Sequence, residues 1–249
     1  TVTGGSDVDF IPVLFAKTTT TTVSEIRSNP KVAAVRIDRE VQGPAPATGV
    51  DTGGDGVRTA ATGQTVPWGV RKIGADRVSD RLRKSAAENV TVAVVDSGVD
   101  YTHPDLDGTV EWGANFLGTE PQYGREAATD DNGHGTAVAG IIAAEDNDRG
   151  VVGITPGAQL YSIKVLDESN TGTVSSLIEG INAALEGPDG TIGTEDDADV
   201  IQVSVGTEVD SDQLAAATAA ASESAVVVSS VGNDGDGDPA TAEVTFPAS

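Results

Sequence analysis

Short β-branched runs alternate with helix-like segments along most of this chain. The runs are 89–96, 159–166, 199–205 and 225–232, and the helix-like segments between them are 134–145, 173–187 and 211–224. Apolar runs of this length are typical of strands that are buried on both faces. Repeated strand–helix–strand units predict an α/β fold, with one parallel sheet and helices on both of its faces.

Two of the helix-like segments show which of their faces should pack against that sheet. In 173–187 the apolar residues recur at helical spacing, as Val174, Leu177, Ile178, Ile181 and Leu185. In 134–145 the expected buried face consists of Ala137, Val138, Ile141 and Ile142. A stripe of this kind on a helix usually faces the core.

The region before the α/β pattern reads differently. Residues 1–42 predict a small α+β unit, with strands at 8–16 and 31–41 and a helix at 21–30. Residues 43–62 are rich in Gly, Pro, Ala and Thr without periodicity, which predicts an exposed linker. The α/β part then occupies residues 63–249.

Polar residues gather at the strand ends, where parallel sheets bind ligands. Asp96 ends the first run, Ser204 and Gly206 follow the third, and Asn233 follows the fourth. His134, one of only two histidines, opens a helix-like segment near the same edge. A carboxylate that orients a histidine, a histidine that acts as general base and an amide that donates to an oxyanion are the parts of an acyl-transfer site.

The protonation of His134 depends on two opposing influences. The N-terminus of a helix disfavours a charged imidazole, whereas a nearby carboxylate such as Asp96 favours it. The sequence leaves open which influence prevails.

The charge balance excludes several partners. The chain has 39 acidic and 15 basic residues, a net charge of −24 and a pI near 4.1. We therefore expect neither nucleic acid nor a membrane surface as a partner. Because salt screens repulsion among like charges, the balance predicts a halophilic protein; the alternative is an acidic surface kept for solubility. The absence of cysteine excludes disulfides and thiolate chemistry.

Five stretches resemble, in order, conserved blocks of the subtilisin-like serine proteases, the subtilase family. They are QTVPWGVRKIGADRV (64–78), VAVVDSGVDYTHPDL (92–106), DDNGHGTAVAG (130–140), GVVGITPGAQLYSIKVL (150–166) and SSVGNDG (229–235). The resemblance implies the subtilisin-like α/β fold and a serine endopeptidase that acts through an acyl-enzyme. Residues 8–41 resemble, more weakly, the later part of the family's ferredoxin-like inhibitory propeptide. Residues 1–42 would then be a partial propeptide that acts as an intramolecular inhibitor.

The resemblance also implies a role for each matching residue. Asp96 would be the orienting acid, His134 the base and Asn233 the oxyanion donor. The substrate-binding residues would be Ser204, Val205, Gly206 and Gly232. The first three of these would form one edge for an extended polypeptide substrate, and residues 169–172 would form the facing edge.

The family's nucleophile is the main departure. It lies in a Gly-Thr-Ser-x-Ala-x-Pro block downstream of the oxyanion asparagine, and no Gly-Thr-Ser occurs in these 249 residues. Two interpretations stay open. Either the chain is a fragment of a longer peptidase, with a C-terminally incomplete fold, or it is a natural non-catalytic protein-binding module. Both predict that the chain alone is inactive.

The resemblance implies a structural calcium ion and a processing step. Gln64, Asp105 and Asn147 match the family's calcium ligands, and all three carry the oxygen atoms that calcium prefers. The parent would be a secreted zymogen that is cut in the 43–62 linker, with the mature enzyme starting near Gly63.

Overall fold

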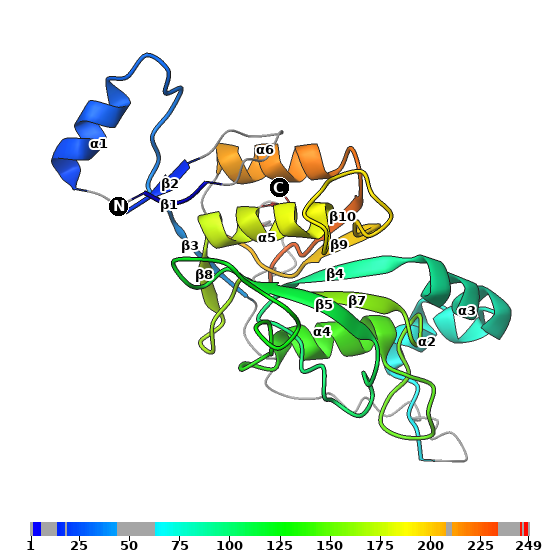
Figure 1. Ribbon diagram of the computed structural model, residues 1–249. Helices are drawn as coiled ribbons and strands as arrows, with labels where there is room; N and C mark the ends of the chain where they lie inside the picture. The colour runs from blue at the N-terminus through cyan, green and yellow to red at the C-terminus, as the bar shows by residue number, and fades with distance from the viewer. Residues whose placement is uncertain are drawn as a thin grey trace, which may run out of the picture.

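The computed structural model describes residues 2–5, 14–17, 19–43, 63–207, 211–233, 245 and 247–248. Its centre is a six-stranded sheet in the order β10-β9-β4-β7-β5-β6 (Figure 1). The strands are β4 (Thr91–Asp96), β5 (Val110–Asn115), β6 (Gln122–Tyr123), β7 (Gln159–Lys164), β9 (Val200–Val203) and β10 (Val226–Ser229). All pairs are parallel except β5 with the edge strand β6. The predicted parallel sheet is confirmed.

Helices cover both faces of the sheet. Helix α4 (His134–Ala143) lies on one face, and α5 (Val174–Glu186) and α6 (Asp212–Ala221) lie on the other (Figure 1). Side chains of β4 alternate between the two layers: Val92 and Val94 join the cluster that includes α4 residues, whereas Ala93 and Val95 join the cluster of α5 and α6. Every residue of β4 is therefore buried, as expected for a strand between two helical layers.

The predicted helix faces have different outcomes. All five predicted core residues of α5 are buried. The prediction for α4 is confirmed for Val138 and Ile142, which pack partly buried against the core, and wrong for Ala137 and Ile141, which are exposed. The fully buried residues of α4 are Gly135, Ala139 and Ala143. The smallest residues of α4 are the most deeply buried, because they allow the closest approach to the sheet, and the larger Val138 and Ile142 flank them.

The segment before β4 is helical. It contains α2 (Trp68–Lys72), the 3₁₀ helix η1 (Ala75–Arg77) and α3 (Asp80–Asn89). Only Val70, Ala75 and Ala87 of these elements are buried, so their apolar pattern is weak. In the described residues no helix is both long enough and apolar enough to span a membrane.

The N-terminal region contains β1 (Val2–Gly5) paired with β2 (Leu14–Ala16), and helix α1 (Thr20–Arg27), outside the α/β body (Figure 1). The predicted strand at 31–41 is wrong over most of its length, because only β3 (Glu40–Gln42) is a strand. Its partner is not in the N-terminal unit but is β8 (Thr171–Thr173). Residues 8–13 and the predicted linker beyond Gly43, up to residue 62, lie outside the described residues.

Candidate active site

An aspartate and a histidine meet at the carboxyl end of the sheet. Asp96 is the last residue of β4 and His134 is the first of α4. The Nδ1 atom of His134 lies 2.7 Å from Oδ1 and 2.9 Å from Oδ2 of Asp96. Asp96 is fully buried, whereas the side chain of His134 is 18% exposed. The carboxylate thus fixes the ring while one side of the ring still reaches solvent.

Two glycines allow this approach. Gly133, the residue before α4, has φ 103°, in the left-handed region that glycine adopts most easily. Gly135 has no room for a Cβ atom, which would collide with the carbonyl oxygen of Gly98 and lie 3.2 Å from Cβ of Asp96. The glycines around His134 therefore let the first turn of α4 lie directly on the end of β4.

Asp130 holds the loop that leads into His134. Its Oδ1 accepts hydrogen bonds from Ser97 Oγ (2.9 Å) and from the backbone N–H groups of Asn132 and Gly133 (3.0 and 2.9 Å). Its Oδ2 accepts from the backbone N–H and the hydroxyl of Thr136 (2.9 and 2.5 Å). One carboxylate thus ties the loop, the first turn of α4 and the residue after Asp96 together.

The charges of this region shift two pKa values. The hydrogen bond with Asp96 raises the pKa of His134 above 6.5, burial opposes it, and the charges of Asp96 and Asp130 raise it further. Burial alone would raise the pKa of Asp130, but hydrogen bonds from Gly133, Thr136 and Asn132 bring that pKa below its ordinary value. At His134 the carboxylates therefore outweigh burial, and the pKa of the ring is raised.

A buried lysine supports the same region from β7. Lys164 is the register partner of Asp96, and its side chain is 4% exposed. Its ammonium group donates to the carbonyls of Ser97 (2.6 Å) and Leu166 (2.9 Å) and to Oδ1 of Asp131 (2.6 Å). It joins the turn after Asp96 to the loop before His134.

A segment of the chain itself lies between two facing edges near this pair. Strand β3 is antiparallel to β8, with Val41 opposite Gly172. On its other side, Gln42 N–H donates to Gly206 O (3.0 Å) and Gly206 N–H donates to Gln42 O (3.1 Å). Residues 40–42 therefore form the middle strand of a three-stranded arrangement.

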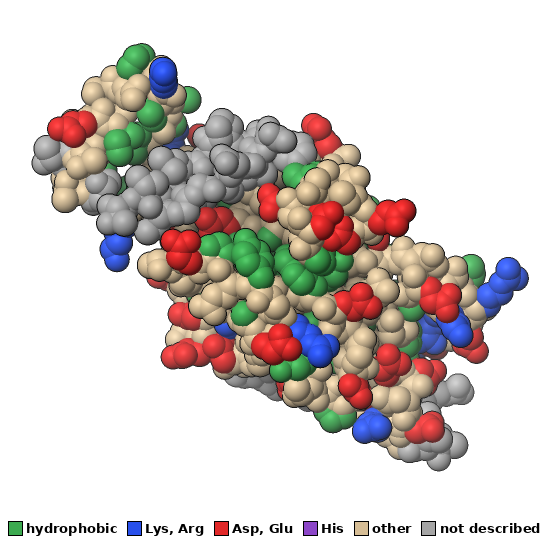
Figure 2. All heavy atoms as spheres, in the orientation of Figure 1, with side chains coloured by type: hydrophobic (Ala, Val, Ile, Leu, Met, Phe, Trp, Pro, Cys, Tyr) green, Lys and Arg blue, Asp and Glu red, His purple; other side chains and the backbone are tan. Residues whose placement is uncertain are grey.

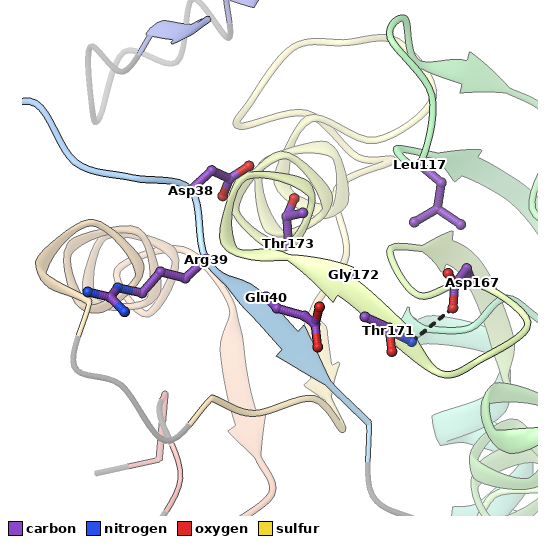
Figure 3. Close-up of a pocket in the computed structure, with 8 residues that line it drawn as sticks. All are labelled: Asp38, Arg39, Glu40, Leu117, Asp167, Thr171, Gly172 and Thr173. Atoms are coloured by element: carbon purple, nitrogen blue, oxygen red, sulfur yellow. Dashed lines mark hydrogen bonds between the residues drawn. The ribbon is translucent and has the colours of Figure 1, made fainter. Parts of the chain in front are cut away.

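Side chains strengthen this docking. Val41 is 1% exposed and belongs to the same buried cluster as Val174 and Val205. The carboxylate of Asp38 accepts from the backbone N–H and the hydroxyl of Ser175 (3.0 and 2.5 Å), in the first turn of α5. A groove of about 570 Å³ opens beside the β3–β8 pair (Figure 3).

Comparisons with known proteins identify the family. The model of the Subtilase family matches residues 87–249, more than half of the chain. The chain belongs to the subtilase family. Similar relatives include subtilisin DY of Bacillus licheniformis (42% identity; 69% of this chain and 57% of the relative) and the major intracellular serine protease of Bacillus subtilis (39%; 74% and 54%). Another is an alkaline protease of Alkalihalobacillus alcalophilus (33%; 97% and 53%). The chain spans about half the length of these relatives.

Other residues that the subtilase resemblance implicated lie at the same edge of the sheet. Ser204 and Val205 follow β9 and are buried, and Gly206 makes the bridge to Gln42. Gly232 and Asn233 follow β10, where Asn233 is exposed. The structure brings Asp96 and His134 into contact, but within the described residues no hydrogen bond joins Asn233 to either of them. The role of Asn233 stays a prediction.

The three residues that match calcium ligands of subtilases converge on one loop. Gln64, 1% exposed, donates from Nε2 to the carbonyls of Glu145 (2.6 Å) and Val151 (3.1 Å). Asp105 Oδ2 accepts from Val151 N–H (2.9 Å), and its Oδ1 is buried with no hydrogen-bond partner. Asn147 Nδ2 donates to Pro104 O, beside Asp105 (3.3 Å). Oε1 of Gln64 and Oδ1 of Asn147 accept from the N–H groups of Asp148 and Arg149 (both 3.2 Å), so the unpartnered Oδ1 of Asp105 is the atom that fits a cation ligand here.

Sequence reasoning missed the residues that support the Asp–His pair. Asp130, Ser97 and Lys164 all lie within the quoted motifs, but no role was assigned to them. Lys164 carried a usable signal, because a lysine inside a buried apolar strand needs a partner for its charge. Asp38 carried no such signal, because its partner is the distant Ser175.

Proposed function

We propose that this chain carries the acid and the base of a subtilisin-like serine endopeptidase. The observation that carries the proposal is the Asp96–His134 contact. Because Nδ1 of His134 is engaged by Asp96, Nε2 is left to take the proton of a nucleophile. The buried carboxylate would stabilise the imidazolium that forms.

The proposed reaction has two halves. As a serine Oγ attacks the peptide carbonyl carbon, its proton passes to Nε2 of His134, and the imidazolium then gives that proton to the leaving amine as the C–N bond breaks. A water molecule next attacks the acyl-enzyme, with His134 again taking a proton and returning it to the serine. The side chain of Asn233 would donate a hydrogen bond to the oxyanion in both halves. The serine would come from the Gly-Thr-Ser block of a longer parent.

A test compares the chain with that parent. The 249-residue chain should neither hydrolyse a peptide ester nor react with a serine-directed inhibitor. The parent should do both. In the parent, His134→Ala should lower kcat by about 10⁶-fold, the loss known for a triad member in subtilisin. Asn233→Ala should lower kcat by roughly 10²–10³-fold, as for the oxyanion donor there. A harmless Asn233→Ala variant would refute the oxyanion role.

A non-catalytic protein-binding module is the second candidate. One observation favours it: main-chain hydrogen bonds and a buried valine hold β3, and these contacts need no nucleophile. If the natural reading frame lacks the serine block and the protein binds extended peptides without cleaving them, this candidate replaces the first.

The second part of the proposal concerns residues 1–42, as a partial propeptide that inhibits the peptidase in cis. Its support is that β3 occupies the space between β8 and Gly206, the two edges expected to hold a polypeptide substrate. A synthetic peptide copying residues 31–43 should inhibit the parent competitively. Cleavage is proposed within 43–62, and N-terminal sequencing of the mature parent should give a start near Gly63.

The remaining proposals concern the environment of the parent. Gln64, Asp105 and Asn147 would hold a structural calcium ion, which would link the segment after the linker to the loop after α4. The acidic surface would suit a halophilic, secreted enzyme. Because two relatives are named as intracellular and others as alkaline proteases, secretion needs its own test, which is recovery of the parent from the culture medium.

A further inference from the structure

The position of Gly43 in the docked segment is unusually restricted. Its N–H donates to the carbonyl of Asn170 (3.0 Å), immediately after the β3 residues that bridge β8 and Gly206. Gly43 is buried. A Cβ atom added to it would lie 2.5 Å from Oδ1 and 2.6 Å from Cγ of Asn170, and it would also collide with Nδ2. Carbon atoms essentially never approach so closely, so an alanine requires a shift of the asparagine or of the backbone.

The restriction comes from space and not from backbone conformation. Gly43 is not among the described glycines with positive φ, so an L-residue can adopt its backbone angles. Position 43 therefore requires glycine only because the side chain of Asn170 fills the space where a Cβ atom would lie.

Asn170 is held in place by its own turn. The residue has φ 62° and is 6% exposed. Its N–H donates to the carbonyl of Asp167 (2.9 Å), and the carboxylate of Asp167 accepts from the N–H groups of Ser169 and Thr171 (2.9 and 3.0 Å; the latter is dashed in Figure 3). The backbone of the turn is braced from inside and the asparagine is buried, so we expect its side chain to resist displacement by a side chain at position 43.

We propose that Asn170 is a specificity-determining residue, which makes the peptide cleft select substrates with glycine at the position held by Gly43. This inference rests on the proposed function, because it treats residues 40–43 as bound in the way that a substrate binds. Insertion of even one methyl group into a filled site commonly costs enough to displace the segment that carries it.

The first test uses the 249-residue chain. In wild type, the N–H groups of Gln42 and Gly206 should be protected from hydrogen exchange, because each donates across the bridge. Gly43→Ala should speed their exchange by about tenfold or more. Asn170→Gly in the same chain should restore most of the protection, because it removes the colliding side chain and glycine accepts positive φ. Gln42→Ala, a change to a neighbouring exposed side chain, is the matched control and should have little effect.

The outcomes separate the inference from the function on which it rests. If Gln42 and Gly206 exchange freely in wild type, β3 is not docked. The glycine selection and the proposed inhibition by residues 1–42 then both fall, whereas the role proposed for Asp96 and His134 is unaffected. If they are protected but Gly43→Ala exchanges no faster, or if Asn170→Gly gives no rescue, only the glycine selection is overturned.

The second measurement uses the serine-bearing parent. Two peptide substrates should be compared. Both copy residues 39–42, and they differ only in having glycine or alanine at the position of Gly43. The glycine peptide should have a kcat/KM about tenfold higher or more, and Asn170→Gly should bring this ratio close to one. A ratio that Asn170→Gly leaves unchanged would refute the inference even if the parent is an active peptidase.

Discussion

The contact with Asp96 is the main cause of the raised pKa of His134. The sequence placed the ring at a helix N-terminus, which disfavours the imidazolium, and near a carboxylate, which favours it. The structure shows a contact of 2.7 Å, and the pKa of His134 is raised. Because a raised pKa means that the folded state binds the proton more tightly, protonation of His134 stabilises the fold below pH 6.5, and this stabilisation is lost as the pH rises through the folded pKa.

An NMR titration of the imidazole resonances can test this balance directly, because the chain has only two histidines. We expect the midpoint of His134 to lie above 6.5. Asp96→Asn should move it below 6.5, because the hydrogen bond to a charged partner is lost while burial, which lowers the pKa, remains. A wild-type midpoint at or below 6.5 would contradict the assignment.

Asp130 should be important for stability, because one carboxylate accepts five hydrogen bonds. Asp130→Asn should lower the free energy of unfolding at pH 7 by about 1.5–3 kcal/mol, the usual range for a hydrogen-bonded charged group. Since the pKa of Asp130 is lowered, this contribution is present above its unfolded pKa and disappears as the pH falls through the folded pKa. Denaturant titrations at several pH values measure this, with the exposed Glu223→Gln variant as control. Equal losses in the two variants would refute the role.

At the residue scale, the sequence revealed the two titratable partners but not their supports. Asp96 and His134 could be predicted because one ends a buried strand and the other opens a glycine-flanked helix. The partners of Asp130 and Lys164 depend on how the loop after β6 folds back over Ser97, which no periodicity encodes.

At the scale of elements, patterns failed where the partner is distant. The alternation in 31–41 predicted a strand of the N-terminal unit, but strand pairing occurs only at 40–42, where β8 supplies the edge. An alternating pattern shows that a segment can form a strand, but it does not identify the strand with which it pairs. Residues 32–39 have no neighbouring strand among the described residues and are therefore irregular. The long buried runs of β4 and β7 were predicted well because burial on both faces leaves a continuous apolar signal.

The link between Asp38 and the first turn of α5 gives a prediction at this scale. Asp38→Ala removes a carboxylate that accepts from Ser175 at the helix N-terminus. The free energy of unfolding should fall by about 1 kcal/mol, which is typical for the loss of a helix N-cap. Hydrogen exchange of the Gln42 amide should become roughly fivefold faster. Glu40→Ala removes the same charge two residues along and should have a smaller effect. If both variants exchange alike, the carboxylate acts only through its charge.

At the scale of the whole molecule, acidic side chains are spread over the visible face and basic ones are fewer (Figure 2). A net charge of −24 opposes the compact state. Sodium chloride should therefore raise the melting temperature. Most of the rise should occur below 1 M, because at 1 M the Debye length is already only about 3 Å and further salt adds little screening. Calorimetry from 0.05 to 3 M measures the curve. A rise that continues unchanged above 1 M would indicate strengthened apolar burial instead, and no rise would refute the halophilic proposal.

Calcium gives the last prediction, which joins two distant parts of the fold. Gln64 already bonds to the carbonyls of Glu145 and Val151 in the continuous chain, so calcium should bind before any processing. An ion held there would also use the unpartnered Oδ1 of Asp105. At a hundredfold excess over Kd the gain is about 2.7 kcal/mol, which corresponds to a rise of roughly 5–11 °C in melting temperature.

Calorimetry at fixed 1 M sodium chloride, with calcium or with chelator, separates this ion from general screening. Asp105→Asn should remove most of the calcium-dependent rise, because it removes the only carboxylate among the three proposed side-chain ligands. Asp107→Asn makes the same charge change two residues away on an exposed side chain and should keep most of the rise. Equal loss in both variants would mean that calcium only neutralises the acidic surface. No rise in wild type would mean that Gln64 holds the loop through its hydrogen bonds alone.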